Sequence, residues 1–85
     1  MPYSISYVPS AAKTLRKLDR QVARRLLQAI GELSENPRPQ GCTQLKGGEG
    51  EYRIRVGDYR VIYEVHDGEL VILVLRAGHR RDVYR

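Results

Sequence analysis

The sequence predicts an α+β fold in which an N-terminal strand and a two-helix hairpin precede a three-stranded antiparallel meander. Three observations favour this class. Apolar and charged residues alternate through residues 52–65, which is the period of half-buried strands. Two glycine-containing turn signals divide the second half of the chain into strand-length segments. Apolar residues also recur at helical spacing between residues 12 and 33.

Tight turns set the pairing of the meander. Gly57-Asp58 fits a type II′ loop, which places glycine first, and Asp67-Gly68 is a type I′ signal. If Gly57 and Asp58 are the loop residues, Arg55 lies opposite Arg60, and Arg53 projects from the same face. The tyrosines of the two strands are expected in the core on the other face: Tyr52, Tyr59 and Tyr63.

The first half of the chain supplies the N-terminal strand and the helices. Large apolar residues alternate with Ser4 and Ser6 through residues 3–7. This pattern predicts a short strand that ends at Pro9 and joins the same sheet. Ser10 is the expected N-cap of a first helix, and Asp19 is the expected N-cap of a second. A loop beginning at Asn36 then leads to the glycine-rich residues 46–50.

The last part of the chain contains its most apolar segment. Residues 70–75 are apolar at every position, which predicts a central strand covered on both faces. Gly78 is expected to turn the chain after this strand. A short extension would then bring His79, Arg80 and Tyr84 toward the arginines of the meander.

The composition predicts one small basic domain spanning residues 1–85. Fifteen Lys and Arg against ten Asp and Glu give a formal net charge of +5, and twelve of the fifteen cationic residues are arginine. A basic small protein is expected to bind nucleic acid, an acidic protein or an anionic membrane surface. The helical segment lacks the aromatic anchors that a membrane surface requires, so we expect no membrane partner.

The few cysteines and histidines of the chain limit the disulfides and metal sites that it can form. The single Cys42 excludes an internal disulfide and fits a reducing environment. The first ten residues lack the apolar core of a secretory signal, so we expect a cytoplasmic protein. One cysteine and two histidines without a neighbouring carboxylate pair predict no metal site, and no cofactor is expected.

The predicted arginine cluster of the meander is the main functional signal. Like charges directly opposite each other on a sheet cost from about a few tenths to 1 kcal/mol, so stability alone does not favour the cluster. Arginine presents a planar fork of donors that matches phosphate oxygens. The cluster therefore predicts a site for a phosphodiester, with Lys46 as a further phosphate contact. The alternative is a solvated polar face.

Several segments together resemble the RelE toxins of bacterial and archaeal toxin–antitoxin systems, within the wider RelE/ParE superfamily. They are LKGG at residues 45–48, YRIRVGDYRVIYEV at residues 52–65, the apolar strand after them, and GHRRDVY at residues 78–84. The ENP sequence at residues 35–37, which closes the helical hairpin, also fits. The resemblance covers nearly the whole chain and implies a fold related to small microbial ribonucleases.

The resemblance implies the toxin of a type II toxin–antitoxin system. Its implied activity is that of a ribosome-dependent, metal-independent endoribonuclease, an mRNA interferase. Such an enzyme cuts mRNA in the A site of the small ribosomal subunit through attack of the 2′-hydroxyl on the adjacent phosphate. A RelB-like antitoxin is the implied partner, and operator DNA is contacted indirectly through the antitoxin.

The resemblance also assigns site residues by motif position. The implied phosphate-binding residues are Arg55, Arg60 and Arg80, with Arg53, Arg81 and Lys46 as further RNA contacts. Some relatives have lysine at the first two sheet positions, so the permanently charged Arg53 and Arg55 favour charge stabilisation over proton transfer.

The general base is left open between two residues. Tyr84 has an ordinary pKa of about 10, which nearby cations lower because they favour the phenolate. His79 belongs to the residue type that most often transfers protons near neutral pH.

Two other functions stay open on the sequence. A ParE-like toxin that inhibits DNA gyrase by binding would share the fold and the antitoxin. A noncatalytic RNA-binding module would need only the basic face. The combination of the GHRRDVY segment with three clustered arginines favours the ribonuclease, because a pure binder has no chemical reason to assemble it.

Overall fold

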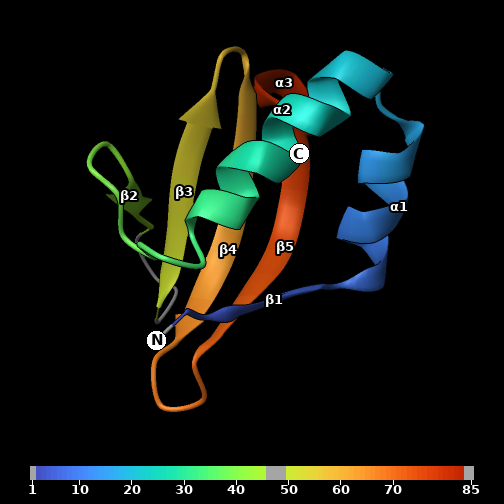
Figure 1. Ribbon diagram of the computed structural model, residues 1–85. Coiled ribbons are helices and arrows are strands. Elements are labelled where there is room, and N and C mark those ends of the chain that lie inside the picture. The colour runs from blue at the N-terminus through green and yellow to red at the C-terminus, as the bar shows by residue number, and fades with distance from the viewer. Residues whose placement is uncertain (1, 46–49, 84–85) are drawn as a thin grey trace.

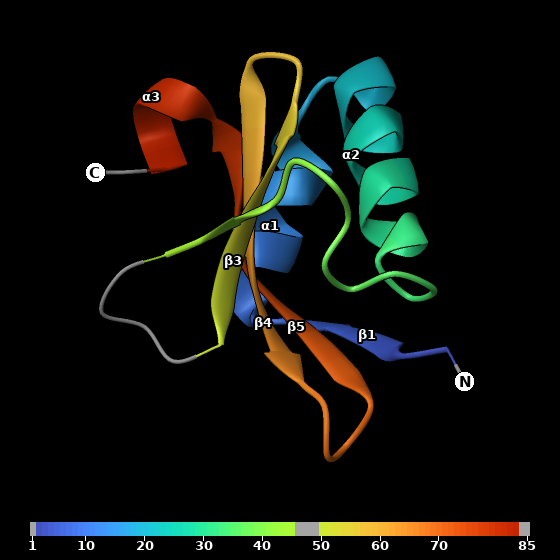
Figure 2. The same ribbon diagram turned by 90° about the vertical axis from the view of Figure 1, so that its left-hand side faces the viewer.

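The computed structural model describes residues 2–45 and 50–83, with the side chains of residues 82 and 83 excepted. Two helices cover one face of a five-stranded sheet with the strand order β1-β5-β4-β3-β2 (Figures 1 and 2). The predicted α+β class is confirmed. In chain order the elements are β1 (Ser4–Tyr7), α1 (Pro9–Lys17), α2 (Arg20–Glu32), β2 (Thr43–Gln44), β3 (Glu51–Val56), β4 (Tyr59–His66), β5 (Val71–His79) and α3 (Arg80–Val83).

The N-terminal strand β1 lies parallel to β5 at one edge of the sheet. The expectation that it joins the meander's sheet is confirmed. The start of the next helix differs from the prediction, because α1 begins at Pro9 and its N-cap is Val8 rather than Ser10. Proline suits the first helical turn, since its fixed φ is helical and its missing N–H has no partner to lose there.

The second helix begins as predicted. The Asp19 carboxylate accepts hydrogen bonds from the backbone N–H groups of Gln21 at 3.0 Å and Val22 at 3.4 Å. The apolar stripe of α2 then packs on the sheet. The largest fully buried side chains come from this helix, the turn after it and the sheet: Tyr63, Leu26, Ile30, Leu33, Ile72, Val61 and Val74.

The β3–β4 hairpin has the predicted two-residue loop. Val56 pairs with Tyr59, and Arg55 lies directly opposite Arg60. Gly57 has a φ of +62°, as the first loop residue of a type II′ turn requires. The three strand tyrosines pack in or against the core on the helix side, as expected: Tyr52, Tyr59 and Tyr63.

The second turn of the meander differs from the prediction. His66 pairs with Val71, so residues 67–70 form a four-residue turn instead of the two-residue Asp67-Gly68 loop. Leu70 has a φ of 55°, in the left-handed region. A type I′ turn would instead have placed Asp67 and Gly68 in that region.

The last strand is also longer than predicted. It continues to His79, so the expectation that Gly78 turns the chain was wrong, and the turn comes at the short helix α3. The two-residue strand β2 was not predicted, because two residues give no periodicity. Within the described residues, no helix has both the length and the apolar character needed to cross a membrane.

Candidate nucleic-acid interface

The sheet face that α1 and α2 leave open carries Arg53, Arg55 and Arg60, and we call these residues the arginine face. Strand alternation decides their direction, because the neighbours Ile54 and Val61 pack in the core on the helix side. Arg55 lies directly opposite Arg60, and Arg53 lies opposite Ile62. Three guanidinium groups therefore start from adjacent positions of two paired strands, on the side of the sheet that faces away from α2 in Figure 2.

Arg60 is held in an unusual state. Its Nε and Nη1 atoms are shielded from solvent and have no hydrogen-bond partner among the described residues. A buried charged donor without a partner costs more than the roughly 1–3 kcal/mol of a neutral one. An anion bound beside Arg60 would remove this cost.

Arg53 is positioned by the short strand β2. Thr43 pairs with Arg53 in the sheet, and the Arg53 Nη2 atom donates to the Thr43 hydroxyl at 3.4 Å. Thr43 therefore supports the arginine face. The sequence contained no signal for this contact, since the pairing of a two-residue strand is visible only in three dimensions.

The C-terminal basic residues come from α3. Figure 2 shows this helix on the opposite side of the sheet from α2, at one end of the strands. The Arg80 N–H donates to the carbonyl oxygen of Asp58 at 3.0 Å, which ties α3 to the β3–β4 turn. Arg80 and Arg81 are exposed. The structure therefore brings both residues to the end of the sheet at which the arginine face lies. Lys46 and Tyr84 lie outside the described residues.

His79 lies on the helix side and not with the arginines. It pairs with Tyr59, and the two rings meet edge to face with their centroids 5.5 Å apart. Both line a cavity of about 470 Å³ next to α1, together with Ser10 and Thr14. The His79 Nδ1 atom accepts a hydrogen bond from the Arg81 N–H at 3.2 Å, so the neutral ring carries its proton on Nε2. The sequence expectation that His79 approaches the arginines was wrong, because β5 continues to His79 and the bulge between Val74 and Arg76 turns His79 to the helix side.

Arg76 was not predicted as a site residue. It pairs with Ile62 of β4, which lies between Arg76 and Arg53 in the sheet, and its side chain is exposed. A β-bulge next to this pair gives Arg76 its direction. Val74 and Ala77 are both buried on the helix side although they are three residues apart. In a regular strand such residues face opposite sides, so their spacing indicates a bulge between them.

A second polar cluster lies at the far end of β4, around Asp67. Tyr3 donates to the Asp67 carboxylate at 2.6 Å, and Arg38 donates to both carboxylate oxygens at 3.2 and 2.7 Å. The Arg38 hydrogen bond, followed by that of Tyr3, holds the pKa of Asp67 below its ordinary value. The Arg38 Nε atom also donates to the Tyr52 hydroxyl at 3.0 Å. This cluster joins segments that are far apart in the chain.

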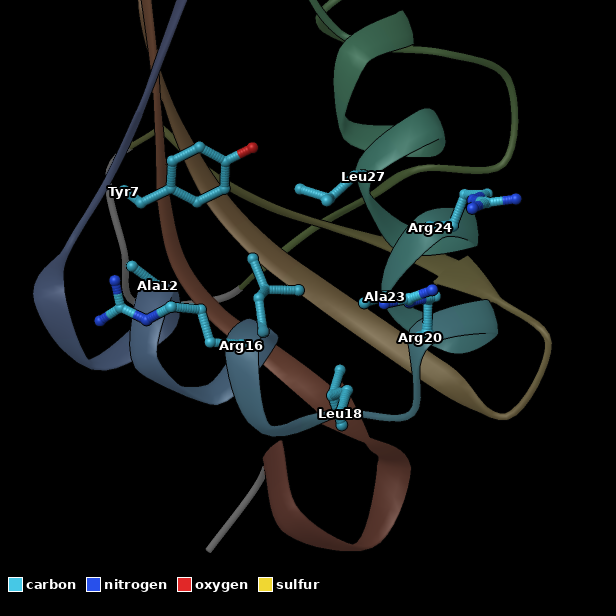
Figure 3. A pocket seen from close by; sticks show the side chains of 9 residues that line it. Tyr7, Ala12, Arg16, Leu18, Arg20, Ala23, Arg24 and Leu27 are labelled. Atoms are coloured by element: carbon cyan, nitrogen blue, oxygen red, sulfur yellow. The ribbon is translucent and has the colours of Figure 1, made fainter.

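A groove of about 760 Å³ lies between α1 and α2. Figure 3 shows Tyr7 and Leu27 pointing toward one another across it. The remaining apolar lining comes from Ala12, Leu15, Leu18 and Ala23, and the basic lining from Arg16, Arg20 and Arg24. Leu27 is 46% exposed, which is unusual for a large apolar residue. The groove thus combines an apolar floor with basic residues. It lies on the helix side of the sheet, because α1 and α2 line it, whereas the arginine face lies on the other side.

No group of three His, Cys, Asp or Glu side chains that could hold a metal ion occurs within residues 2–45 and 50–81. Glu64 lies on the same sheet face as the arginines and contacts His66 of its own strand at 2.9 Å.

Comparison with known proteins identifies the family. A sequence model described as the ParE toxin of the type II toxin–antitoxin system parDE matches residues 5–84. The chain belongs to the RelE/ParE toxin family. This toxin is 31% identical over 86 residues to toxin RelG of Mycobacterium tuberculosis, covering 100% of this chain and 99% of the relative. It is 32% identical over 82 residues to the mRNA interferase toxin RelE of Escherichia coli, covering 94% of this chain and 85% of the relative.

Solved structures place the toxin on the RelE side of the family. The archaeal RelE–RelB complex from Pyrococcus horikoshii contains a chain that superimposes with a TM-score of 0.82 at 32% identity, over 96% of this chain and 99% of that one. The intact Escherichia coli RelBE toxin–antitoxin complex gives a TM-score of 0.81 at 30% identity, over 91% of this chain and 95% of that one. The chain is therefore a RelE-type toxin of a type II toxin–antitoxin system.

Proposed function

We propose that this toxin is an endoribonuclease that cuts mRNA in the ribosomal A site. The observation that carries the proposal is the half-buried Arg60, whose Nε and Nη1 atoms are shielded from solvent and have no hydrogen-bond partner among the described residues. Arg55 lies directly opposite it in the sheet. A phosphodiester supplies the missing acceptors. Relatives at 32% identity that are named mRNA interferases support RNA as the source of that phosphodiester.

The proposed reaction uses the nucleophile that RNA itself provides. The 2′-hydroxyl loses its proton to a general base, its oxygen attacks the adjacent phosphorus, and the bond from phosphorus to the 5′-oxygen breaks as that oxygen gains a proton. Negative charge grows on the phosphoryl oxygens in the transition state, and Arg55, Arg60 and Arg80 are assigned to stabilise it. This chemistry requires neither a metal ion nor a covalent protein intermediate.

Tyr84 is the proposed general base. Of the two residues left open by the sequence, His79 is the poorer choice, because its ring packs on Tyr59 on the helix side of the sheet. We assign His79 a positioning role instead, through the hydrogen bond that its Nδ1 atom accepts from the Arg81 N–H. Arg53, Arg81 and Lys46 are assigned to the RNA on either side of the scissile phosphate.

The proposed protein partner is a RelB-like antitoxin. Several solved relatives are toxin–antitoxin complexes, including the RelBE2 complex of Mycobacterium tuberculosis. In this chain the groove between α1 and α2 suits an amphipathic, acidic helix, because its floor is apolar and three arginines line it. Operator DNA would be contacted through the antitoxin. The proposed site of action is the cytoplasm, where the ribosome is.

The decisive experiment is mRNA cleavage in a purified translation system, with the 5′ ends of the fragments mapped. Wild-type toxin should cut within codons at the A site, and Arg60→Ala should slow cleavage by about 10²- to 10³-fold, the usual loss of a preorganised oxyanion donor. Lys13→Ala is the matched control, since it removes the same charge from the exposed surface of α1 at a residue outside the groove.

Two outcomes would contradict the proposal. Equal cleavage by Arg60→Ala and Lys13→Ala would exclude Arg60 from the reaction. A folded wild-type toxin that cuts no mRNA but blocks DNA supercoiling by gyrase would favour the ParE-like function, for which the match to the ParE family model is the supporting observation.

A further inference from the structure

The bulge in β5 changes which residues of this strand face the helices. Val74 is fully buried and Ala77 is 6% exposed, and both belong to the core on the helix side. In a regular strand, every second residue after Val74 would face the helices, so Arg76 would point toward them. The sheet register avoids this, because Tyr63 pairs with Val74 whereas its neighbour Ile62 pairs with Arg76, leaving Leu75 as the extra residue.

As a result, Arg76 extends the arginine face by one strand. The open face has a row formed by Arg53, Ile62 and Arg76, and a second row formed by Arg55, Arg60 and Gly78. Ile62 is only 7% exposed although it does not belong to the core on the helix side. Arg53 of β3 and Arg76 of β5 pair with Ile62 from its two sides. A buried apolar residue therefore lies between the two arginines.

The spacing of the rows assigns Arg76 to a different phosphate from the one at Arg60. Neighbouring strands lie about 4.8 Å apart, so the backbones of Arg53 and Arg76 are about 10 Å apart. The two rows are separated by two residues along each strand, or about 7 Å. A polynucleotide that places one phosphate between Arg55 and Arg60 would pass its next phosphates over the row that contains Arg76.

We propose that Arg76 is an RNA-positioning residue that binds a phosphate next to the scissile one. The inference rests on the proposed ribonuclease function and adds a residue to it. Arginine keeps its charge at any physiological pH and suits phosphate oxygens, and bulges that redirect a side chain are frequent next to active sites. Arg76 acts on affinity for RNA, whereas Arg60 acts on the chemical step.

The test separates affinity from chemistry. Affinity is measured with a short single-stranded RNA that carries a 2′-deoxy nucleotide at the cleavage position, and chemistry is measured as the single-turnover rate of mRNA cleavage on ribosomes at saturating toxin. Arg76→Ala should weaken RNA binding about tenfold and reduce the salt dependence of log K by about 0.7, the value for one phosphate contact to a single strand. Its saturated cleavage rate should equal that of wild-type toxin.

Two further variants keep the result interpretable. Arg76→Lys should recover most of the salt dependence because it restores the charge. Arg76→Gln keeps much of the side-chain stem and should bind as weakly as Arg76→Ala, which shows that the charge and not the packing is responsible. Lys13→Ala is the control for loss of an exposed charge on the helix side, at a residue of α1 that lines neither the groove nor the arginine face.

Three results would overturn the inference. If Arg76→Ala and Lys13→Ala have the same affinity and salt dependence while wild-type toxin cleaves mRNA, Arg76 has no role in RNA binding and the proposed function stands. A slower saturated rate for Arg76→Ala would make Arg76 part of the chemistry instead. A wild-type toxin that neither binds nor cuts RNA would overturn the proposed function together with the inference.

Discussion

The Asp67 carboxylate joins segments that are far apart in the chain. It accepts hydrogen bonds from Tyr3 in the N-terminal segment and from Arg38 in the loop after α2, while Asp67 itself lies in the β4–β5 turn. The Arg38–Asp67 ion pair is largely exposed, with side-chain exposures of 42% and 56%, so its contribution to stability is modest. Its dependence on pH is nevertheless well defined.

Asp67→Asn tests this dependence. The folded protein holds the pKa of Asp67 below its ordinary value, so the folded state binds fewer protons than the unfolded state, and the carboxylate stabilises the fold above about pH 3.9. This contribution is lost as the pH falls through the lower pKa of the folded state. The substitution should therefore lower the urea midpoint at pH 7, with a difference that shrinks as the pH is taken from 4 toward 2. Glu69→Gln, at an exposed carboxylate of the same turn, is the control.

A constant difference between wild type and Asp67→Asn across this pH range would contradict the assignment of the effect to the Asp67 charge. It would point to the shape of the turn instead.

Residue by residue, the sequence predicted the part of the site that depends on simple alternation. Arg53, Arg55 and Arg60 share a face because a two-residue turn joins two regular strands. If alternation continued through β5 without interruption, Arg76 would face the helices and His79 would face the side of the arginines. The bulge at Leu75 is the cause of the observed arrangement, and only the spacing of Val74 and Ala77 hints at it in the sequence.

At the scale of the elements, the β3–β4 turn controls the register of the arginine face. Gly57 has a φ of +62°, a conformation that costs a residue with a Cβ atom about 1–2 kcal/mol. A Cβ at this position would lie 3.4 Å from the Arg25 side chain, which is close to ordinary contact, so backbone strain is the main cost.

Gly57→Ala should therefore lower the free energy of unfolding by about 1–2 kcal/mol in a urea titration. Gly68→Ala is the matched control, because no atom lies within 4 Å of its Cβ position and its φ is not in the left-handed region. This variant should be neutral or stabilising by up to about 1 kcal/mol. Equal losses in the two variants would show that Gly57 is not required by its conformation.

The elements that could be predicted were those with their own local signals. Asp19 marked the start of α2 because its side chain caps the helix, and Gly57 marked a tight turn. The second turn could not be predicted from Gly68, since the left-handed conformation falls on Leu70. The short strand β2 forms by pairing with β3, and the short helix α3 begins where β5 ends. Neither element has a local sequence pattern that would predict it.

At the scale of the whole molecule, the sheet separates the two surfaces that we propose for binding. The groove lies on the side that α1 and α2 cover, and the arginine face lies on the other side. A substitution in the groove should therefore affect antitoxin binding without changing RNA cleavage. Leu27 offers the test, since it lines the groove and is 46% exposed.

Leu27→Asp should weaken binding of a RelB-like antitoxin by about tenfold or more, because burying a leucine side chain is worth about 1.5–3 kcal/mol and a tenfold change is 1.4 kcal/mol. The mRNA cleavage rate of the free toxin should stay the same. Gln28→Asp adds the same charge one residue later on the exposed surface of α2 and should change neither quantity. Isothermal titration with the purified antitoxin measures the effect, and unchanged affinity for Leu27→Asp would exclude the groove as its site.

The pairing of β1 with β5 has a consequence for how the toxin is made. Ser4 to Tyr7 pair with a strand whose first residue is Val71, so the sheet closes only after β5 has emerged from the ribosome. Contacts between such distant residues also slow folding, because the intervening chain must be ordered first. Until β5 has emerged, a nascent chain also lacks the β4–β5 pairing that places Arg76 beside the arginine face. The proposed RNA-binding surface is therefore completed late in synthesis, after the hairpin that carries the first three arginines.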